Sequence, residues 1–404
     1  MKNNTQKNFY IIAMSPVGDG LSGGDRIFIE LARSAIRNSI RTTLISWKAG
    51  FAMCKKTDLL SGKNLIFLSL DTPLFSLPSF FVNYLARIAK TIMWSCSYQF
   101  CESDTGVSIL YSASDFWMDV IPSCILKIRY PHIRWVGTFY LAAPNPLKGY
   151  KEGGRWRVPS MKGIIYWCLQ LPMYWLIRRF SQFVFVTSEP EKKRFPKQTK
   201  ENKIVVIKGG VNLDKVHQFQ KKIGKVQKIY DGVFIGRFHP QKGVLELVEI
   251  WNILVKKLPS AKLIMIGDGP QMGKVKEKIR KLHLEKNIEL TGYLIDGLQK
   301  YTIFAKSKIV VHPAIYDSGG MAAAEAMAWG MPGVSFNLDA LKTYYPKGMI
   351  KCPLHNKQKF ALIVLSLLKN KRRYFAVKND ALDLITNYWD WSKRASEGLR
   401  QIFN

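Results

Sequence analysis

The sequence predicts an α/β protein made of two doubly wound, Rossmann-like domains. Three observations support this prediction. Short runs of β-branched and other apolar residues recur along the chain and alternate with segments of helical periodicity. Turns that contain glycine follow several of these runs, as they do at the carboxyl ends of strands in parallel sheets. The chain has 404 residues and is 47% hydrophobic and 22% charged, which suits a globular protein of two or three domains.

Positive charge is the most unusual feature of the composition. Lysine and arginine total 61 against 29 aspartate and glutamate residues, which gives a formal net charge of +32. Such an excess favours anionic partners, namely nucleic acids, phosphorylated ligands or an anionic membrane surface. No nucleic-acid recognition module with stacked aromatic residues is present, so we expect no nucleic-acid partner.

Cysteine usage and the N-terminus bear on location. The six cysteines show no spacing typical of zinc ligands, so we expect reduced thiols. No DxD-like carboxylate cluster is present, so we expect no bound metal, and we also expect no cofactor. The apolar run at the N-terminus is too short for a signal peptide, and no uncharged window reaches the roughly 18 residues of a transmembrane helix. We therefore expect a cytoplasmic protein.

The first domain is expected to span residues 1–200. It opens with a strand over Phe9–Met14, a glycine-rich loop and a helix over Ile27–Ala35. This order suits close approach to a phosphate or a sugar, and a tight turn without a ligand is the alternative. The glycine spacing is not GxGxxG, so a dinucleotide site is not predicted. Further strands are expected over Thr42–Trp47, Leu65–Leu70, Val107–Tyr111, Arg134–Gly137 and Phe183–Ser188.

Two segments of the first domain combine large apolar residues with cations. They span Leu74–Cys101 and Trp156–Phe180, with basic residues inside the first and at the edges of the second. A helix with an aromatic body and cationic flanks suits the surface of an anionic bilayer. Packing in a core or at a domain interface is the alternative. The inner face of the membrane is therefore a candidate site of peripheral attachment.

The second domain is expected to span residues 201–385. A polar stretch, Glu191–Lys203, and a lysine-rich run, Lys215–Lys228, are interpreted as the connection between the domains. The terminal segment 386–404 is an amphipathic helix that is a candidate to pack back on the first domain. Strands alternating with helices are predicted over Gly232–Gly236, Ala261–Ile266, Ile288–Thr291, Ile309–His312 and Val334–Phe336.

The stretch His312–Ser335 carries the most informative chemistry. Asp317 follows a predicted strand, two glycines come next, and Glu325 lies about one turn inside a helix of good helix formers. Asp317 is thus expected at the carboxyl end of a strand, where open parallel sheets bind ligands. A carboxylate such as Glu325 can accept hydrogen bonds from vicinal hydroxyls. The alternative is an alanine-rich core helix with an acid in the loop before it.

Two cations follow another strand of the second domain. Arg237 and Lys242 lie five positions apart in the loop that leads into a helix. Both side chains can reach a diphosphate, to which arginine makes a forked contact and lysine contributes a point charge. The alternative is a solvated surface pair, because a chain of this charge contains many such pairs.

Three motifs occur in order in the second half. They are G-R-F-H-P-Q-K-G from Gly236, I-G-D-G-P from Ile266, and the acidic pair D-x7-E formed by Asp317 and Glu325. As a set they resemble the retaining GT-B glycosyltransferases of the group 1, family 4 type. The first half adds S-G-G-D-R and Y-S-A-S-D-F-W-M-D, which resemble that family's N-terminal glycine loop and acceptor side. The resemblance implies two Rossmann-like domains that face each other across a cleft.

The resemblance also implies roles for individual residues. Arg237 and Lys242 would hold the diphosphate of a nucleotide-sugar donor, Glu325 its ribose, and Asp317 would face the transferred sugar. The remaining donor contacts would come from glycine-rich loops, with the following members: Gly319, Gly320 and Met321 at sugar and phosphate; Gly267, Asp268 and Gly269 on the nucleotide side; and Gly23 and Gly24 from the first domain.

The sequence departs from the family's pattern at two places. The first acid of the pair is Asp317 where glutamate is usual. The histidine that commonly follows the strand at Arg134–Gly137 is absent, and Tyr140 is the candidate for a polar contact on the acceptor side. His312 stands at a strand end and is expected to have a structural role near the site.

These expectations together describe an enzyme. By resemblance, it is a retaining, metal-independent hexosyltransferase that moves a sugar from a UDP- or GDP-sugar to a glycan or lipid-linked acceptor at the cytoplasmic membrane surface, in polysaccharide or glycolipid synthesis. The alternatives are a GT-B sugar-nucleotide epimerase and a non-catalytic GT-B-like protein that binds anionic polymers.

Overall fold

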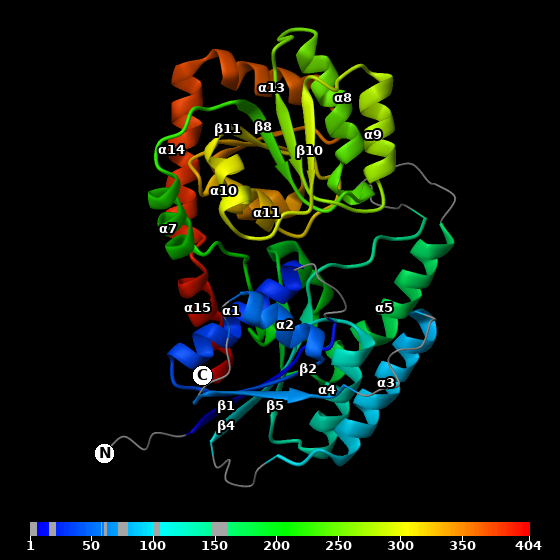
Figure 1. Ribbon diagram of the computed structural model, residues 1–404. Helices are drawn as coiled ribbons and strands as arrows, with labels where there is room; N and C mark the ends of the chain where they lie inside the picture. Colours follow the sequence, from blue (N-terminus) through cyan, green and yellow to red (C-terminus); the bar gives the residue numbers. More distant parts are fainter. Residues whose placement is uncertain are drawn as a thin grey trace. The chain divides into compact units, whose positions relative to one another are not determined.

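The computed structural model describes residues 6–15, 22–57, 59, 63–71, 80–100, 106–147 and 160–404 (Figure 1). The chain divides into two compact units. The first combines Met1–Pro146, Val158–Ile207 and Ser392–Asn404, and the second is built mainly of Lys208–Trp391. The predicted division after residue 200 thus falls ahead of the last strand of the first unit, and the last residues of the chain return to that unit.

A seven-stranded parallel sheet forms the centre of the first unit, with strand order β3-β2-β1-β4-β5-β6-β7. The order reverses between β1 and β4, so the loops that follow these two strands meet at the carboxyl edge of the sheet, where such folds bind ligands. The strands are β1 (Lys7–Ile12), β2 (Arg41–Ser46), β3 (Leu65–Ser69), β4 (Val107–Ser112), β5 (Arg134–Phe139), β6 (Phe183–Val186) and β7 (Ile204–Val206).

Helices flank this sheet, and one of them comes from the far end of the chain. In that helix, α15, the hydroxyl of Ser396 lies 3.0 Å from that of Ser34, and Ile402 O accepts a hydrogen bond of 3.3 Å from Arg134. The helices of the unit are α1 (Gly23–Arg37), α2 (Lys48–Lys56), α3 (Phe80–Ser97), α4 (Trp117–Arg129), α5 (Met161–Phe180), α6 (Pro196–Lys200) and α15 (Trp391–Phe403).

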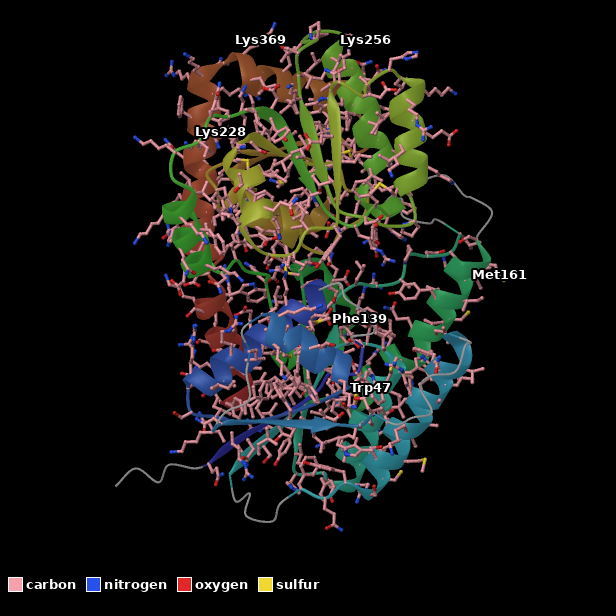
Figure 2. The ribbon with its side chains drawn as sticks, in the orientation of Figure 1. Trp47, Phe139, Met161, Lys228, Lys256 and Lys369 are labelled. Atoms are coloured by element: carbon pink, nitrogen blue, oxygen red, sulfur yellow. The ribbon has the colours of Figure 1, made fainter. Side chains whose placement is uncertain are left out.

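The two aromatic segments form α3 and α5, and both helices pack against α4. Residues 74–79 and 156–159 of these segments, and Cys101, lie outside the described residues. One face of each helix packs within the unit, as the core alternative expects, while the other presents large apolar side chains to solvent. Figure 2 shows Met161, 70% exposed, at the end of α5. No helix in the described ranges is long and apolar enough to cross a membrane.

The lysine-rich run after residue 213 is not a linker, and that interpretation was wrong. It contains helix α7 (Leu213–Ile223), which packs against the second unit. Val216 is buried, and the ring of Phe219 lies 4.8 Å from that of Tyr301. The lysines occupy the solvent-facing positions of this amphipathic helix, so composition alone concealed its apolar stripe.

The second unit is built around a six-stranded parallel sheet with order β10-β9-β8-β11-β12-β13. Its order reverses between β8 and β11, which makes the carboxyl ends of these two strands the switch point of the sheet. The strands are β8 (Tyr230–Ile235), β9 (Leu263–Ile266), β10 (Ile288–Gly292), β11 (Ser307–His312), β12 (Gly333–Phe336) and β13 (Met349–Cys352).

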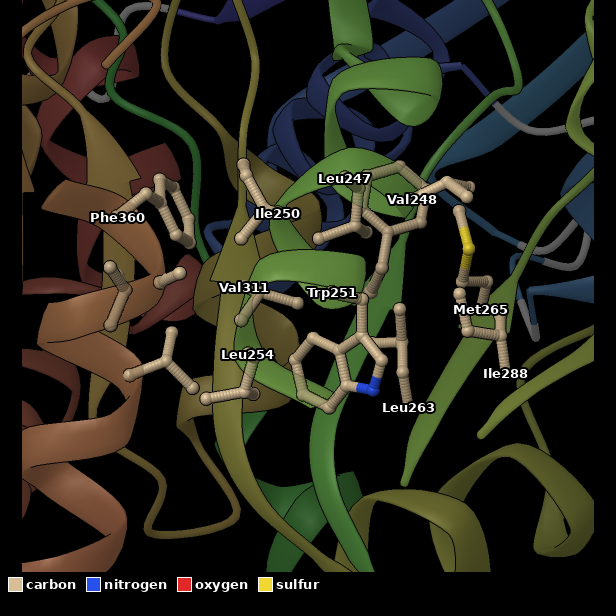
Figure 3. Packing of buried hydrophobic residues seen from close by; sticks show 14 of the residues in the cluster. Leu247, Val248, Ile250, Trp251, Leu254, Leu263, Met265, Ile288, Val311 and Phe360 are labelled. Carbon is tan, nitrogen blue, oxygen red and sulfur yellow. The ribbon is translucent and has the colours of Figure 1, made fainter. Parts of the chain in front are cut away.

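Helices cover the sheet of this unit, so strand residues of both faces are buried. This is why most of its strands are nearly continuous apolar runs in the sequence. On one face Trp251 of α8 packs beside Leu254 and Leu263, with Val311 and Phe360 in the same cluster (Figure 3). The helices are α7, α8 (Val244–Val255), α9 (Met272–Lys281), α10 (Leu298–Ala305), α11 (Met321–Met327), α12 (Asp339–Tyr344), α13 (Lys357–Lys369) and α14 (Lys371–Tyr388).

Candidate active site

The switch point of the second sheet brings together two loops that are far apart in the sequence. The amide of Ile315, after β11, donates a 2.9 Å hydrogen bond to Gln241 O, after β8. Gly243 has a φ of +65°, and a Cβ there would lie 2.0 Å from Pro313 O. Only glycine fits both this backbone conformation and this close approach. The two loops are therefore fixed against each other before any ligand binds.

Asp317 is the centre of the site. Its Oδ2 lies 2.6 Å from Lys242 Nζ and 3.0 Å from His312 Nε2. Its Oδ1 accepts hydrogen bonds from the next three amides, those of Ser318, Gly319 and Gly320, at 2.8, 3.2 and 3.0 Å. The side chain is only 6% exposed. Asp317 therefore joins Lys242 and His312 to the backbone that leads into α11.

The electrostatics of this arrangement keep Asp317 ionised. Burial raises the pKa of its carboxyl group, but the charge of Lys242 and the hydrogen bond and charge of His312 outweigh burial and hold the pKa well below its ordinary value of 3.8. His312 thus contacts Asp317 from the end of β11, which agrees with the structural role expected for it. The amides of Gly319 and Gly320 donate to Asp317 here, and their contacts to sugar and phosphate stay a prediction.

Glu325 belongs to a second ionic cluster at the same edge of the sheet. Lys300 Nζ lies 2.8 Å from Glu325 Oε1 and 2.7 Å from Asp296 Oδ1. The Lys300 side chain is 3% exposed and lies over the rings of Tyr301 and Phe304, with 5.9 and 5.7 Å to the ring centroids. Sequence reasoning missed Lys300. The only signal was a single charged residue, a lysine, beside the aromatic residues of this helix.

Arg237 and the glycine turn after β9 flank the switch point. Arg237 is exposed on the loop after β8. Burial, followed by the charges of Arg237 and Lys242, lowers the pKa of His239 on the same loop. Gly267 and Gly269 adopt φ of +140° and +154°. Asp268 O accepts a 2.8 Å hydrogen bond from the amide of Phe238, so this turn packs directly on the loop that carries Arg237.

The first unit brings its own predicted residues together. Gly23 and Gly24 open α1, whose start is a capping box between Ser22 and Asp25. A Cβ on Gly24 would lie 3.5 Å from the ring of Tyr140, whose hydroxyl is 2.5 Å from that of Tyr111. Residues 16–21 of the glycine-rich loop lie outside the described residues. Gly24 and Tyr140 are thus neighbours at the carboxyl edge of the first sheet.

Two carboxyl groups at this edge, the buried Asp119 and the half-buried Asp115, were not singled out from the sequence. Asp119 Oδ1 accepts a 2.6 Å hydrogen bond from the amide of Met14, and its Oδ2 accepts one from Ser114. Asp115 accepts one of 2.5 Å from Gln170. Burial raises the pKa of Asp119 to about 8 and that of Asp115 to about 6. Burial therefore favours the protonated form of Asp119.

The architecture and the site define a class of protein. Two doubly wound parallel sheets in one chain, each with flanking helices, make up the GT-B fold. Residues 215–382, which contain the whole switch-point site, match the family described as glycosyl transferases group 1. The match covers the residues whose motifs predicted this family.

Comparison with known proteins adds particular relatives. An uncharacterized glycosyltransferase of Methanocaldococcus jannaschii is 27% identical over 203 residues, which are 47% of this chain and 46% of that protein. The poly(glycerol-phosphate) alpha-glucosyltransferase of Bacillus subtilis is 25% identical over 163 residues, 39% of this chain and 24% of that protein. The matches thus span less than half the length of these relatives.

Solved structures resemble the chain over nearly its whole length. TarM of Staphylococcus aureus, solved with UDP, alpha-GlcNAc-glycerol and Fondaparinux, has a TM-score of 0.72. The likeness covers 99% of this chain and 100% of that chain at 13% sequence identity. At this identity the likeness establishes the fold, which confirms the predicted GT-B architecture.

Proposed function

We propose that the protein is a retaining glycosyltransferase. It moves a hexosyl group from a UDP- or GDP-sugar to a glycan or lipid-linked acceptor, in polysaccharide or glycolipid synthesis. The observation that carries the proposal is the fixed Lys242–Asp317–His312 group at the switch point of the second sheet, with Arg237 and Glu325 at the same edge. This is where doubly wound sheets bind nucleotides.

The diphosphate of the donor is the leaving group, so negative charge builds up on its oxygens as the glycosidic bond breaks. Lys242 is already oriented by Asp317, and Arg237 is free to approach from the loop after β8. Cations held in place before the reaction stabilise such charge without reorganisation. The proposal therefore assigns charge neutralisation to these two side chains rather than to a divalent metal ion.

The chemical step follows from this placement. The acceptor hydroxyl attacks the anomeric carbon from the face that the leaving diphosphate occupies, so the anomeric configuration is retained. The new bond joins the acceptor oxygen to the anomeric carbon, and the bond to the diphosphate oxygen breaks. The departing phosphate takes the proton of the acceptor hydroxyl, so no protein base is needed.

The relatives support the choice of donor and acceptor classes. One matched relative is named a poly(glycerol-phosphate) alpha-glucosyltransferase, and a structural neighbour was solved with UDP. Both names are consistent with a nucleotide-sugar donor and a polymeric or glycan acceptor.

The proposal includes peripheral attachment to the inner face of the membrane. Val82, Leu85 and Met93 on α3 are 45, 49 and 68% exposed, and Ile165 and Trp175 on α5 are 51 and 59% exposed. Solvent-facing helix positions are normally polar, and large exposed apolar patches mark interaction sites. Neither helix contains an acidic residue, whereas α5 ends in two exposed arginines. Apolar side chains with cations suit an anionic bilayer.

A panel of nucleotides tests the donor site. The midpoint of thermal unfolding would be measured with UDP, GDP and ADP and with their sugars. A ligand at 100 times its dissociation constant adds about 2.7 kcal/mol, which is readily detected. We expect the nucleotide of one base to stabilise the protein, and we expect the sugar nucleotide of the same base to act as the donor in a transfer assay. Absence of stabilisation by every nucleotide would overturn the proposal, and release of an altered sugar nucleotide without transfer would identify an epimerase instead.

A further inference from the structure

The most unusual buried charge in the second unit is Lys300. Its side chain is 3% exposed, whereas its two partners, Glu325 and Asp296, are 12 and 23% exposed. The ammonium group is therefore less exposed to solvent than the two carboxylates that it binds at the carboxyl edge of the sheet. The rings of Tyr301 and Phe304 cover the ammonium group from the side of the helix.

A contribution to the free energy of folding does not by itself explain why this charged cluster is buried. Burying an ion pair costs desolvation that its mutual attraction only partly offsets, so apolar side chains of similar volume are often as stabilising. A buried cation does, however, fix the orientation of the carboxylates that it binds. Lys300 comes from α10, Glu325 from α11 and Asp296 from the loop directly before α10, so one ammonium group sets the relative position of α10 and α11.

We propose that Lys300 is a positioning residue for the nucleotide: it holds Glu325 so that this carboxylate meets the ribose hydroxyls of the donor. The inference rests on the proposed function, in which Glu325 is the ribose contact. A carboxylate offers about four lone-pair sites, so the same group can accept hydrogen bonds from Lys300 and from a diol. A glutamate without this partner has three rotatable side-chain bonds, and it would be held at the ribose less often.

The geometry also assigns a part to Asp296. By sharing the same ammonium group it ties the start of α10 to Glu325, and it supplies the second negative charge that keeps Lys300 paired. Its Oδ1 lies 2.7 Å from Nζ, as close as Glu325 Oε1 at 2.8 Å. Loss of Asp296 alone should leave the bond between Lys300 and Glu325 in place.

The test compares a nucleoside diphosphate with its 2′,3′-dideoxy analogue by calorimetry, using the base that the thermal panel selects. For the wild-type protein we expect the ribose hydroxyls to contribute at least 10-fold in affinity, as hydrogen bonds to charged groups do. In Lys300→Met we expect this ratio to fall to about 1. The matched control is Lys308→Met, because Lys308 forms a 2.7 Å ion pair with Asp231 at the opposite edge of the same sheet. It should leave the ratio unchanged.

Two further variants separate positioning from folding. Lys300→Met combined with Asp296→Asn removes one charge of each sign, and it should fold while still losing the ribose preference. Lys300→Met added to Glu325→Gln should change the affinity no further than Glu325→Gln alone, because Lys300 acts through Glu325. Additive losses in that pair, or a preserved ribose preference in Lys300→Met, would overturn the inference while leaving the nucleotide site intact. A wild-type protein that binds no nucleotide would instead overturn the proposed function.

Discussion

Lys242 and Asp317 are 75 positions apart in the sequence, yet their charged atoms lie 2.6 Å apart in the structure. The pair joins the loops after β8 and β11 at the switch point of the second sheet, and His312 of β11 contacts Asp317. One carboxylate thereby aligns the proposed diphosphate cation and caps three amides of the following loop. The site is preorganised by bonds within the protein.

The first prediction concerns Lys242→Ala. We expect transfer to fall by about 100-fold or more, because a cation placed at developing charge is lost. We also expect the free energy of unfolding to drop by about 2 kcal/mol, since the buried Asp317 loses its lysine partner but keeps its contacts with His312 and three amides. Urea unfolding and a transfer assay measure the two effects. The control is Lys342→Ala, whose exposed pair with Asp339 should contribute no more than about 0.5 kcal/mol. Transfer near the wild-type rate would refute the role of Lys242.

The second prediction compares two glycines. Gly243→Ala should destabilise the protein by more than about 2 kcal/mol, because the new methyl group would meet Pro313 O and the backbone has positive φ. Gly273→Ala, inside α9, meets nothing within 4 Å and should be neutral or stabilising, since alanine is the better helix former. Thermal unfolding of both variants checks this. Equal stability of the two would show that the loops after β8 and β11 are not packed as described.

The third prediction concerns pH. The pKa of Asp119 is raised by burial to about 8 in the folded state, above its ordinary value of 3.8. The folded protein therefore keeps a proton that the unfolded chain releases. This contribution to stability is complete below about pH 4 and is lost as the pH rises toward 8, at no more than about 1.4 kcal/mol per pH unit.

Asp119→Asn removes that dependence. Asparagine can accept from the amide of Met14 as aspartate does, and its Nδ2 can donate to the hydroxyl of Ser114, which reverses the direction of that hydrogen bond. The variant should therefore gain stability relative to the wild type between pH 5.5 and pH 8, as measured by urea unfolding at both values. Asp339→Asn, at an exposed position, is the control and should show no such gain. A constant difference between Asp119→Asn and wild type across this range would contradict a protonated Asp119.

The fourth prediction concerns the membrane. The protein should float with liposomes that contain anionic lipid and less so with neutral ones, and added salt should weaken the association. Trp175→Glu and Met93→Glu should each reduce flotation, because they place a negative charge in the apolar faces of α5 and α3. Leu362→Glu is the matched control, since Leu362 is 47% exposed but lies on α13 of the second unit. A stable dimer in sedimentation without flotation would show that a second copy covers these faces instead.

Much of the fold could be predicted from the sequence. The centres of β8, β9 and β11 are short apolar runs because both faces of a parallel sheet are covered, and this pattern is local. The glycine turns after them and the order of the three motifs also identified the family. The lysine-rich residues of α7 misled the prediction, because a helix that buries only one narrow stripe has the composition of a linker.

Other features were decided only by the tertiary structure. Which loops meet at a switch point depends on strand order, so the sequence alone could not pair Asp317 with Lys242 or turn its carboxylate inward onto three amides. A lysine in a helix is solvated by default, and Lys300 is buried where Glu325 from α11 joins its local partner Asp296. The sequence thus determined the elements, the family and the positions of the charged groups. The partners of those charges were set by packing, because an ion pair at close range depends on segments that only the fold brings together.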